Sequence, residues 1–317
     1  MEKIREASRI ILDKTGFEGK TAVILGSGLG GFSDALKEKR SLKYSEITHY
    51  PEPTVSGHSG ELISGKLNNS DILVASGRMH MYEGCSLDKV IFPIKVLKEC
   101  GIENLIITNS AGSLKMENPP GSIMIVEGHI DFTFKDGIDD PKIITDKKFH
   151  SLELSSIAKS VSLKNGIDLK KGNYCWVLGP AYETPLEINY FQSLNGSAVG
   201  MSTLPEIREG GALGMKLLTL SLLTNFAAGI SKQPLTHEEV LENAGNSKES
   251  MIKLLSGIIQ GKGKVLKITT KKDHISFEIS FPKNFSINLK KGASVSVNGV
   301  CLTSLNNGKK NLNFDVI

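Results

Sequence analysis

Two short polar stretches carry the side chains best suited to chemistry on an anion. The stretch T-A-V-I-L-G-S-G-L-G-G-F (21–32) places Ser27 among glycines directly after an apolar run. The stretch S-G-R-M-H-M-Y-E-G (76–84) puts Arg78, His80 and Tyr82 at alternate positions, so in an extended segment all three would point the same way. An arginine fork beside a histidine donor suits a phosphate oxygen. Together the two stretches predict a phosphate site.

The glycine turn has two other interpretations. Gly26, Gly28 and Gly31 fit G-x-G-x-x-G, the signature of a dinucleotide-binding turn and hence of an oxidoreductase, but this needs a helix and a second parallel strand within about 30 residues. We expect a helix over 32–39, yet the Pro, Gly and Asn residues that follow indicate a hairpin and loop before the next buried strand near 72. Backbone N–H groups at a helix N-terminus can instead hold a phosphate. A tight packing turn without a ligand is the third interpretation.

The elements that must position these residues are short apolar runs alternating with helical patterns. One such pattern, L-D-K-V-I-F-P-I-K-V-L-K-E-C-G (87–101), ends at a glycine stop. The alternation predicts an α/β fold with a mixed, mostly parallel sheet flanked by helices, and ligands bind such sheets at the carboxyl ends of their strands. The expected strands are 21–25, 72–76, 104–109, 122–126, 174–178 and 217–225.

The pattern changes near residue 260. From there apolar and polar residues alternate between Gly and Asn turns, which is typical of antiparallel strands. We therefore expect a boundary near 258–262, with G-K-G-K as a hinge, an α/β domain over 1–258 and a small all-β domain, a partial barrel, over 259–317.

Composition narrows the function classes. The net charge is +4, and the stretch from residue 260 onward carries ten lysines against three acids. That stretch has no arginine and no aromatic residues interleaved with its lysines, so solvated lysines are favoured over a nucleic-acid surface. The four cysteines show no C-x-x-C spacing, which argues against a metal knuckle or disulfide framework. With no leader pattern and no apolar span, we expect a cytoplasmic protein without a membrane partner.

Residues 1–258 resemble the trimeric purine nucleoside phosphorylases, whose near relatives include methylthioadenosine phosphorylases. The motifs occur in the family's order, namely V-I-L-G-S-G-L-G-G-F, S-G-H-S-G, G-R-M-H-M-Y-E-G, T-N-S-A-G-S-L, G-P-A-Y-E-T-P-L-E, A-V-G-M-S-T-L-P-E and L-T-H-E-E-V-L. The resemblance implies a homotrimer that cleaves purine (deoxy)ribonucleosides with inorganic phosphate as co-substrate and without a metal or organic cofactor. The products would be the free purine and (deoxy)ribose 1-phosphate.

The resemblance also implies the site, residue by residue. The phosphate would lie among Ser27, His58, Arg78, His80, Ser110 and Ser202. The nucleoside would contact Tyr82, Tyr182, Glu183, Val199, Met201, Thr224, Asn225 and His237. Of these, the catalytic group would comprise His80, Glu183, Asn225 and His237.

Asn225 bears on the choice of purine. Its amide can donate to O6 and accept from a protonated N7, whereas an aspartate would be expected in a relative that works on 6-aminopurines. Inosine and guanosine are therefore favoured, and methylthioadenosine phosphorolysis is the alternative.

Two features depart from the family pattern. The segment after His129-Ile130 is shorter than usual and lacks the family's aromatic residue that reaches the neighbouring subunit's ribose; Phe132, Phe134 or Phe149 could substitute. Ser110 stands where the family commonly has alanine, which adds a hydroxyl to a backbone role.

Residues 255–317 resemble the N-terminal lumazine-binding barrel of riboflavin synthase. V-N-G-V-C-L-T is the most specific part, and the match ends before the family's threonine-rich segment and closing strand. A truncated appendage, a flavin- or lumazine-sensing module that regulates a weakly catalytic protein, and an active synthase are the three interpretations.

Overall fold

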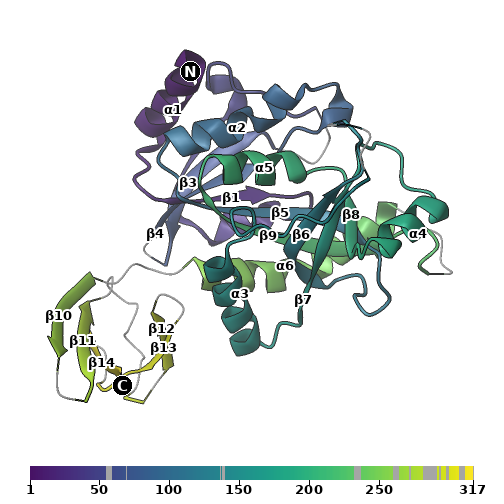
Figure 1. Cartoon of the computed structure of the whole chain (residues 1–317). Helices are drawn as coiled ribbons and strands as arrows, with labels where there is room; N and C mark the ends of the chain where they lie inside the picture. Colours follow the sequence, from purple (N-terminus) through teal and green to yellow (C-terminus); the bar gives the residue numbers. More distant parts are fainter. Residues whose placement is uncertain are drawn as a thin grey trace.

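The larger part of the chain is an α/β unit and the smaller part is all β (Figure 1). The structure is a computed structural model. It describes residues 1–54, 59–68, 70–135, 137, 140–231, 237–259, 264–270, 273–280, 291–292, 294–297, 300–306 and 311–316. Within these ranges no helix combines the length and the apolar character needed to cross a membrane.

In the described part of the larger unit, nine strands form one mixed sheet in the order β2-β3-β4-β1-β5-β8-β7-β6-β9. Five of the neighbouring pairs are parallel, which confirms the mixed, mostly parallel sheet expected from the sequence. The strands are β1 (Thr21–Leu25), β2 (Lys37–Lys43), β3 (Glu61–Leu67), β4 (Ser70–Ser76), β5 (Asn104–Ser113), β6 (Ile123–Asp131), β7 (Leu169–Trp176), β8 (Ala198–Gly200) and β9 (Lys216–Phe226).

Part of this sheet closes on itself. Strand β9 pairs with β6 in antiparallel and with β5 in parallel orientation, while β8 bridges β5 and β7. The strands β5, β8, β7, β6 and β9 therefore form a ring, and β1, β4, β3 and β2 extend from β5 as an open sheet. The closure brings the carboxyl ends of β5 and β9 next to β8, at one end of the ring.

Helices cover both faces of the sheet, as Figure 1 shows. Helices α3 and α6 pack against the side chains on one face of β1, which include Val23 and Leu25. Helices α1, α2 and α5 pack against the opposite set, including Ala22 and Ile24, because successive strand residues face opposite ways. The helices are α1 (Glu2–Thr15), α2 (Leu87–Glu99), α3 (Leu152–Asn165), α4 (Pro185–Ser193), α5 (Leu204–Ala212) and α6 (His237–Ile258), with the 3₁₀ helices η1 (Gly30–Ala35), η2 (Tyr44–Glu46) and η3 (Met81–Glu83).

The helix expected over 32–39 is wrong. The chain forms the short η1 and then β2, which pairs antiparallel with β3. The sequence K-E-K-R-S-L-K has no strong local preference against a helix, so the distant partner strand decides. All six apolar runs do form strands, although β7 ends at Trp176 rather than at residue 178.

The smaller unit has two antiparallel sheets among its described residues. One has the order β10-β11-β14 and the other pairs β12 with β13, so the period-2 pattern is confirmed as antiparallel pairing. A small core joins them, with Leu312 and Phe314 fully buried. The predicted hinge G-K-G-K lies mostly outside the described residues. The strands are β10 (Lys264–Thr270), β11 (Ile275–Ser280), β12 (Ser294–Val297), β13 (Val300–Thr303) and β14 (Asn311–Val316).

Candidate functional site

The glycine turn after β1 is fastened to β5 by hydrogen bonds. The Thr108 hydroxyl accepts from the Gly26 N–H at 3.0 Å and donates to the Ile24 carbonyl at 2.9 Å. The Ser110 hydroxyl donates to the Ser27 carbonyl at 2.9 Å. These bonds place Ser27 and Ser110, both predicted phosphate contacts, next to each other.

Gly26, the first glycine of the turn, lies where the backbones of β1 and β5 approach each other closely. A Cβ on Gly26 would lie 2.6 Å from the Cα of Asn109, so no side chain fits between β1 and β5 there. Gly28 has φ 78, a conformation that glycine adopts without strain. Because η1 is a six-residue 3₁₀ helix, the anion site would use the N–H groups of the turn and not the end of an α-helix.

Arg78 lies at the centre of the site and is 4% exposed. Its Nη1 donates to the hydroxyls of Ser202 and Thr203, each at 3.2 Å, and its Nη2 donates to the Thr108 carbonyl at 2.8 Å. The guanidinium thus joins the ends of β4 and β5 to the start of α5, and it brings the predicted phosphate contact Ser202 to the glycine turn.

His80 is extended, but Tyr82 does not continue the extended segment. The chain enters η3 at Met81, and the ring of Tyr82 stacks on the ring of His80 with centroids 4.7 Å apart. The prediction of an extended segment is therefore wrong from Met81 onward. The cause is the 3₁₀ turn, in which Glu83 accepts a hydrogen bond from the His80 backbone N–H at 2.7 Å.

Hydrogen bonds to Glu83 fix the position of His80. Its Oε1 lies 2.9 Å from Nδ1 of His80, and its Oε2 accepts from the Thr54 N–H at 2.7 Å and from the Thr54 hydroxyl at 2.6 Å. Burial raises the pKa of Glu83, but these hydrogen bonds outweigh it and the net pKa is lowered. Burial lowers the pKa of His80 and nearby Arg78 adds to this, while Glu83 opposes both. Because the ionised Glu83 accepts from Nδ1, a neutral His80 carries its one proton there, and donation from Nε2 to an oxyanion requires the protonated imidazole.

The residues predicted to contact ribose meet at Gly179. A Cβ on Gly179 would overlap the Met201 side chain and lie 3.1 Å from Cδ1 of Tyr82. Tyr182 follows on the same loop, is 53% exposed, and is close enough to Tyr82 to raise the pKa of that phenol together with burial. The two tyrosines and Met201 therefore border one space.

Two residues predicted to contact the nucleoside, Val199 and Asn225, meet at Gly112 on β5. A Cβ there would lie 3.2 Å from Nδ2 of Asn225 and 3.4 Å from Cγ1 of Val199. The Asn225 amide has a defined orientation, because Oδ1 accepts from the Thr224 hydroxyl at 3.0 Å and Nδ2 donates to the Phe226 carbonyl at 3.0 Å. An amide oxygen can accept twice and an NH₂ can donate twice, so each atom retains capacity for a ligand.

Glu183 is partly buried on the loop before α4. Burial raises the pKa of its carboxyl group and the charge of Glu187 adds to that effect. Two predicted site residues cannot be placed: His58 lies outside the described residues, and His237 begins α6 but its side chain is among those not described.

Several residues that sequence reasoning missed hold this site together. Thr203 has φ 79, which is rare for a β-branched residue, and its hydroxyl also accepts from Nδ2 of Asn109 at 3.0 Å. Glu206 lies 3.3 Å from Nε of Arg78. Glu83, three residues after His80, fits the spacing of a local cap and could have been found; the roles of Thr203 and Glu206 depend on contacts with distant strands.

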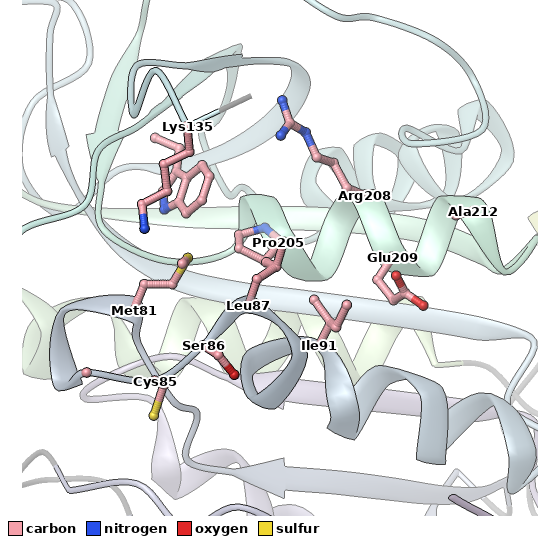
Figure 2. A pocket seen from close by; sticks show the side chains of 12 residues that line it. Met81, Cys85, Ser86, Leu87, Ile91, Lys135, Pro205, Arg208, Glu209 and Ala212 are labelled. Carbon is pink, nitrogen blue, oxygen red and sulfur yellow. The ribbon is translucent and has the colours of Figure 1, made fainter. Parts of the chain in front are cut away.

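A separate cleft of about 810 Å³ opens on the other side of Met81, between η3, α2 and α5. Figure 2 shows Leu87 and Ile91 of α2 facing Pro205 of α5 across it, with Lys135 at one end. None of the predicted site residues that the structure describes lines this cleft. Its lining comprises Met81, Gly84, Cys85, Ser86, Leu87, Ile91, Lys135, Trp176, Pro205, Arg208, Glu209 and Ala212.

Comparison with known proteins places both units. A family model described as "Phosphorylase superfamily" matches residues 20–260, and one described as "Lumazine binding domain" matches residues 256–317. The two matches overlap at 256–260, within the end of α6 and the residues after it. Both resemblances noted in the sequence are confirmed.

The curated relatives and solved structures agree. "Purine nucleoside phosphorylase 1" of Geobacillus stearothermophilus is 37% identical over 268 residues, which is 82% of this chain and 98% of the relative. "Purine nucleoside phosphorylase" of Bos taurus is 33% identical and covers 83% of this chain and 96% of its own length. The crystal structure of Schistosoma mansoni purine nucleoside phosphorylase in complex with inosine superposes with a TM-score of 0.75 at 30% identity, over 83% of this chain and 98% of that one.

Proposed function

The chain belongs to the phosphorylase superfamily and, within it, to the purine nucleoside phosphorylases, and from this premise we propose that it prefers 6-oxopurine nucleosides, inosine and guanosine. The reaction takes up inorganic phosphate and releases the free purine and (deoxy)ribose 1-phosphate. The observation that carries this preference is the oriented Asn225 amide, whose Oδ1 accepts from Thr224 and whose Nδ2 donates to the Phe226 carbonyl.

The chemistry requires no side-chain nucleophile. As the C1′–N9 bond breaks, its electron pair stays with the purine and positive charge develops on the ribose. A phosphate dianion stabilises that charge and then forms the C1′–O bond. Arg78 binds the phosphate, with Ser27, Ser110 and Ser202 around it. Positioning and electrostatic stabilisation supply most of the catalysis in transfers of this kind.

The purine end of the site supports the preference for 6-oxopurines. With its orientation set by Thr224, the Asn225 amide donates to O6 from Nδ2 and accepts at Oδ1 from an N7 that takes up a proton. Glu183, when ionised, accepts from N1–H and from the 2-amino group of guanine. The contact from Nδ2 to O6 becomes stronger as negative charge develops on the leaving base, which is the requirement for catalysis, whereas Glu183 serves to recognise the purine.

We assign the remaining contacts from the resemblance to the family. Tyr82 and Met201 lie against the ribose, Tyr182 and Val199 border the purine, and a protonated His80 donates from Nε2 to the phosphate. His237 meets the 5′-hydroxyl and His58 completes the phosphate shell. The reaction uses no metal or organic cofactor.

Ranking substrates tests the preference. Initial rates of phosphorolysis are measured for inosine, guanosine, adenosine and methylthioadenosine at one phosphate concentration. We expect kcat/KM for inosine and guanosine to exceed that for the two 6-aminopurines. Equal or faster cleavage of methylthioadenosine would assign the alternative function.

For the aromatic contribution to a neighbouring subunit in a homotrimer, Phe134 fits best. Phe132 is buried against Phe191, with ring centroids 4.1 Å apart, and Phe149 packs on His129 at 5.3 Å. Phe134 is 54% exposed and has φ 54, so its side chain is presented outward by a strained backbone. Phe134→Ala should raise KM for inosine and leave KM for phosphate unchanged.

The tail has a separate test. Its match to the lumazine-binding family supports flavin or lumazine binding as a regulatory function, next to a truncated appendage without a ligand or an active synthase. Titration of riboflavin and dimethyl-lumazine, followed by ligand fluorescence, distinguishes them. Quenching would establish the binding module, and unchanged fluorescence at tens of micromolar protein would leave the appendage.

A further inference from the structure

A buried carboxylate lies behind Arg78, on the side of the guanidinium opposite the nitrogen that meets Ser202. Oε1 of Glu206 is 3.3 Å from Nε of Arg78, and the two side chains are 5% and 4% exposed. The contact is an ion pair without hydrogen-bond geometry, since Nε has no hydrogen-bond partner among the described residues. Glu206 thus faces Nε, while Ser202, Thr203 and Thr108 accept from three of the four Nη N–H groups, so that among the described contacts one N–H of Nη2 is left for a ligand.

Local helix geometry does not account for Glu206. The sequence T-L-P-E (203–206) has the spacing of a capping box at the start of α5. The Thr203 side chain nevertheless makes no cap hydrogen bond, and its hydroxyl accepts from Arg78 instead. Both polar ends of this motif are therefore directed at the arginine.

The second oxygen of Glu206 faces a small cavity whose lining includes a few polar groups among apolar side chains. Glu206 Oε2 and the Tyr50 hydroxyl are buried and have no hydrogen-bond partner among the described residues. Both residues line a cavity of about 10 Å³ together with Tyr44, Gly77, Arg78 and Pro93. A space of roughly 10–15 Å³ with two or more polar neighbours accommodates one water molecule. The Tyr44 hydroxyl already donates to the Gly77 carbonyl at 2.8 Å, so Tyr50 is the phenol available to such a water.

Stability alone is a poor reason for this arrangement. Taking a carboxylate and a guanidinium out of water costs several kcal/mol per ion, and apolar side chains of similar volume often serve stability as well. Burial raises the pKa of Glu206 and the charge of Arg78 opposes this, so the carboxylate depends on the arginine to remain ionised. A costly pair of this kind is explained by a requirement for a defined guanidinium orientation.

We propose that Glu206 is a positioning residue for phosphate binding, which holds the plane of the Arg78 guanidinium from behind, supported by Tyr50 through one water in the cavity between them. The inference rests on the proposed function, because it takes Arg78 as the phosphate ligand. Its consequence is specific: Glu206 acts on phosphate affinity through Arg78, and the purine end of the site, at Asn225, does not depend on it.

Glu206→Gln tests this proposal, since it keeps the side-chain size and removes the charge. KM for inorganic phosphate should rise at least about tenfold, the loss expected when one charge-assisted hydrogen bond is misaligned. KM for inosine and kcat at saturating phosphate should stay within about threefold. Glu209→Gln is the matched control: it lies one turn later on α5, is partly buried, and pairs only with Lys95 at 4.0 Å among the contacts described. It should leave both KM values unchanged.

Two further variants keep the test decisive if Glu206→Gln fails to fold. Tyr50→Phe removes only the hydroxyl and should raise KM for phosphate about threefold, the loss of roughly one neutral hydrogen bond. Glu206→Asp retains a carboxylate and should recover part of the phosphate affinity. A merely structural role would change both KM values together, and that result would overturn the proposal, as would an unchanged KM for phosphate in both the Gln and Phe variants.

An Arg78 variant separates this inference from the function on which it rests. If Arg78→Met keeps the wild-type KM for phosphate, the proposed phosphate site and the role of Glu206 both fail. If Arg78→Met loses phosphate binding while Glu206→Gln and Tyr50→Phe retain it, the phosphate site stands and the positioning role alone is wrong.

Discussion

Replacing Arg78 with methionine removes the charge at the centre of the proposed phosphate site and keeps most of the side-chain volume. Two costs follow from the contacts in the structure. The phosphate loses its arginine, and Glu206, which is 4% exposed, loses its counter-charge. The first cost appears in catalysis and the second in stability, so the two can be measured separately.

The catalytic cost comes from hydrogen bonds to a charged ligand. Such a bond contributes about 1.5–3 kcal/mol, and one N–H of Nη2 is not engaged in the described contacts, so its loss corresponds to about 10- to 10²-fold in kcat/KM for phosphate. The stability cost of breaking a buried ion pair is about 3–5 kcal/mol. For a domain of this size that predicts a fall in Tm of roughly 6–20 °C.

The pH dependence of the stability loss has a defined sign. Burial raises the pKa of Glu206 and Arg78 lowers it, so without the arginine this pKa rises further above that of the unfolded chain. A carboxyl group with a raised native pKa contributes stability below its unfolded pKa of about 4.5 and loses it as pH rises. Arg78→Met should therefore lose more stability relative to wild type at pH 8 than at pH 5.

The double variant Arg78→Met, Glu206→Met completes the assay. Removing both charges leaves no buried unpaired ion, so Tm should return to within a few degrees of wild type, while kcat/KM for phosphate stays low. Thermal unfolding and steady-state inosine phosphorolysis are measured on all three proteins. A double variant as unstable as the single one would refute the ion-pair reasoning, and a single variant with wild-type phosphate kinetics would refute the site.

Three further changes test other parts of the structure. Asn225→Asp should lower kcat/KM for inosine by at least about tenfold and raise the adenosine-to-inosine ratio, because the carboxylate can accept from a 6-amino group but cannot donate to O6; an unchanged ratio in parallel assays would contradict the assignment. Ser110→Ala removes the hydrogen bond to the Ser27 carbonyl and should raise KM for phosphate about fivefold, a loss near 1 kcal/mol, whereas a change in KM for inosine alone would point to a different role. Nδ1 of His129 and Nε2 of His150 are buried 3.0 Å apart, and burial lowers the pKa values of the two side chains to about 3 and about 4. The unfolded chain therefore binds protons at these histidines below pH 6.5 while the native protein does not, so stability should fall by about 1.4 kcal/mol per pH unit for each histidine between pH 6 and 4.5. Urea unfolding of His150→Gln should show a shallower dependence of stability on pH.

The sequence was sufficient for six of the nine described strands of the main sheet, because these strands contain continuous apolar runs, whereas β2, β3 and β8 were not predicted. The run T-A-V-I-L (21–25) is one example, and it lies between β4 and β5 as a central strand. By contrast K-E-K-R-S-L-K (37–43) is mostly exposed, so its local pattern does not distinguish a helix from the edge strand that it forms with β3. Burial makes a strand recognisable, and edge strands depend on a distant partner.

In the candidate site, too, the local sequence predicts some features and long-range contacts determine the others. The motifs predict which residue types meet a phosphate, but Arg78 reaches Ser202 across 124 positions of sequence, and only the fold shows that this arginine also has Glu206 behind it. Tyr82 was expected in an extended segment, yet the 3₁₀ turn capped by Glu83 rotates it onto His80. Contacts between residues far apart in sequence supply the orientation of each group, which residue type alone does not specify.

The most direct test of the account is the formation of ribose 1-phosphate from inosine by the purified full chain. Hypoxanthine and ribose 1-phosphate are quantified together, with and without inorganic phosphate, for the wild type and Arg78→Met. The account predicts equal amounts of the two products from the wild type, none without phosphate, and a loss of both in the variant. Hypoxanthine released without phosphate, or free ribose in place of ribose 1-phosphate, would contradict it.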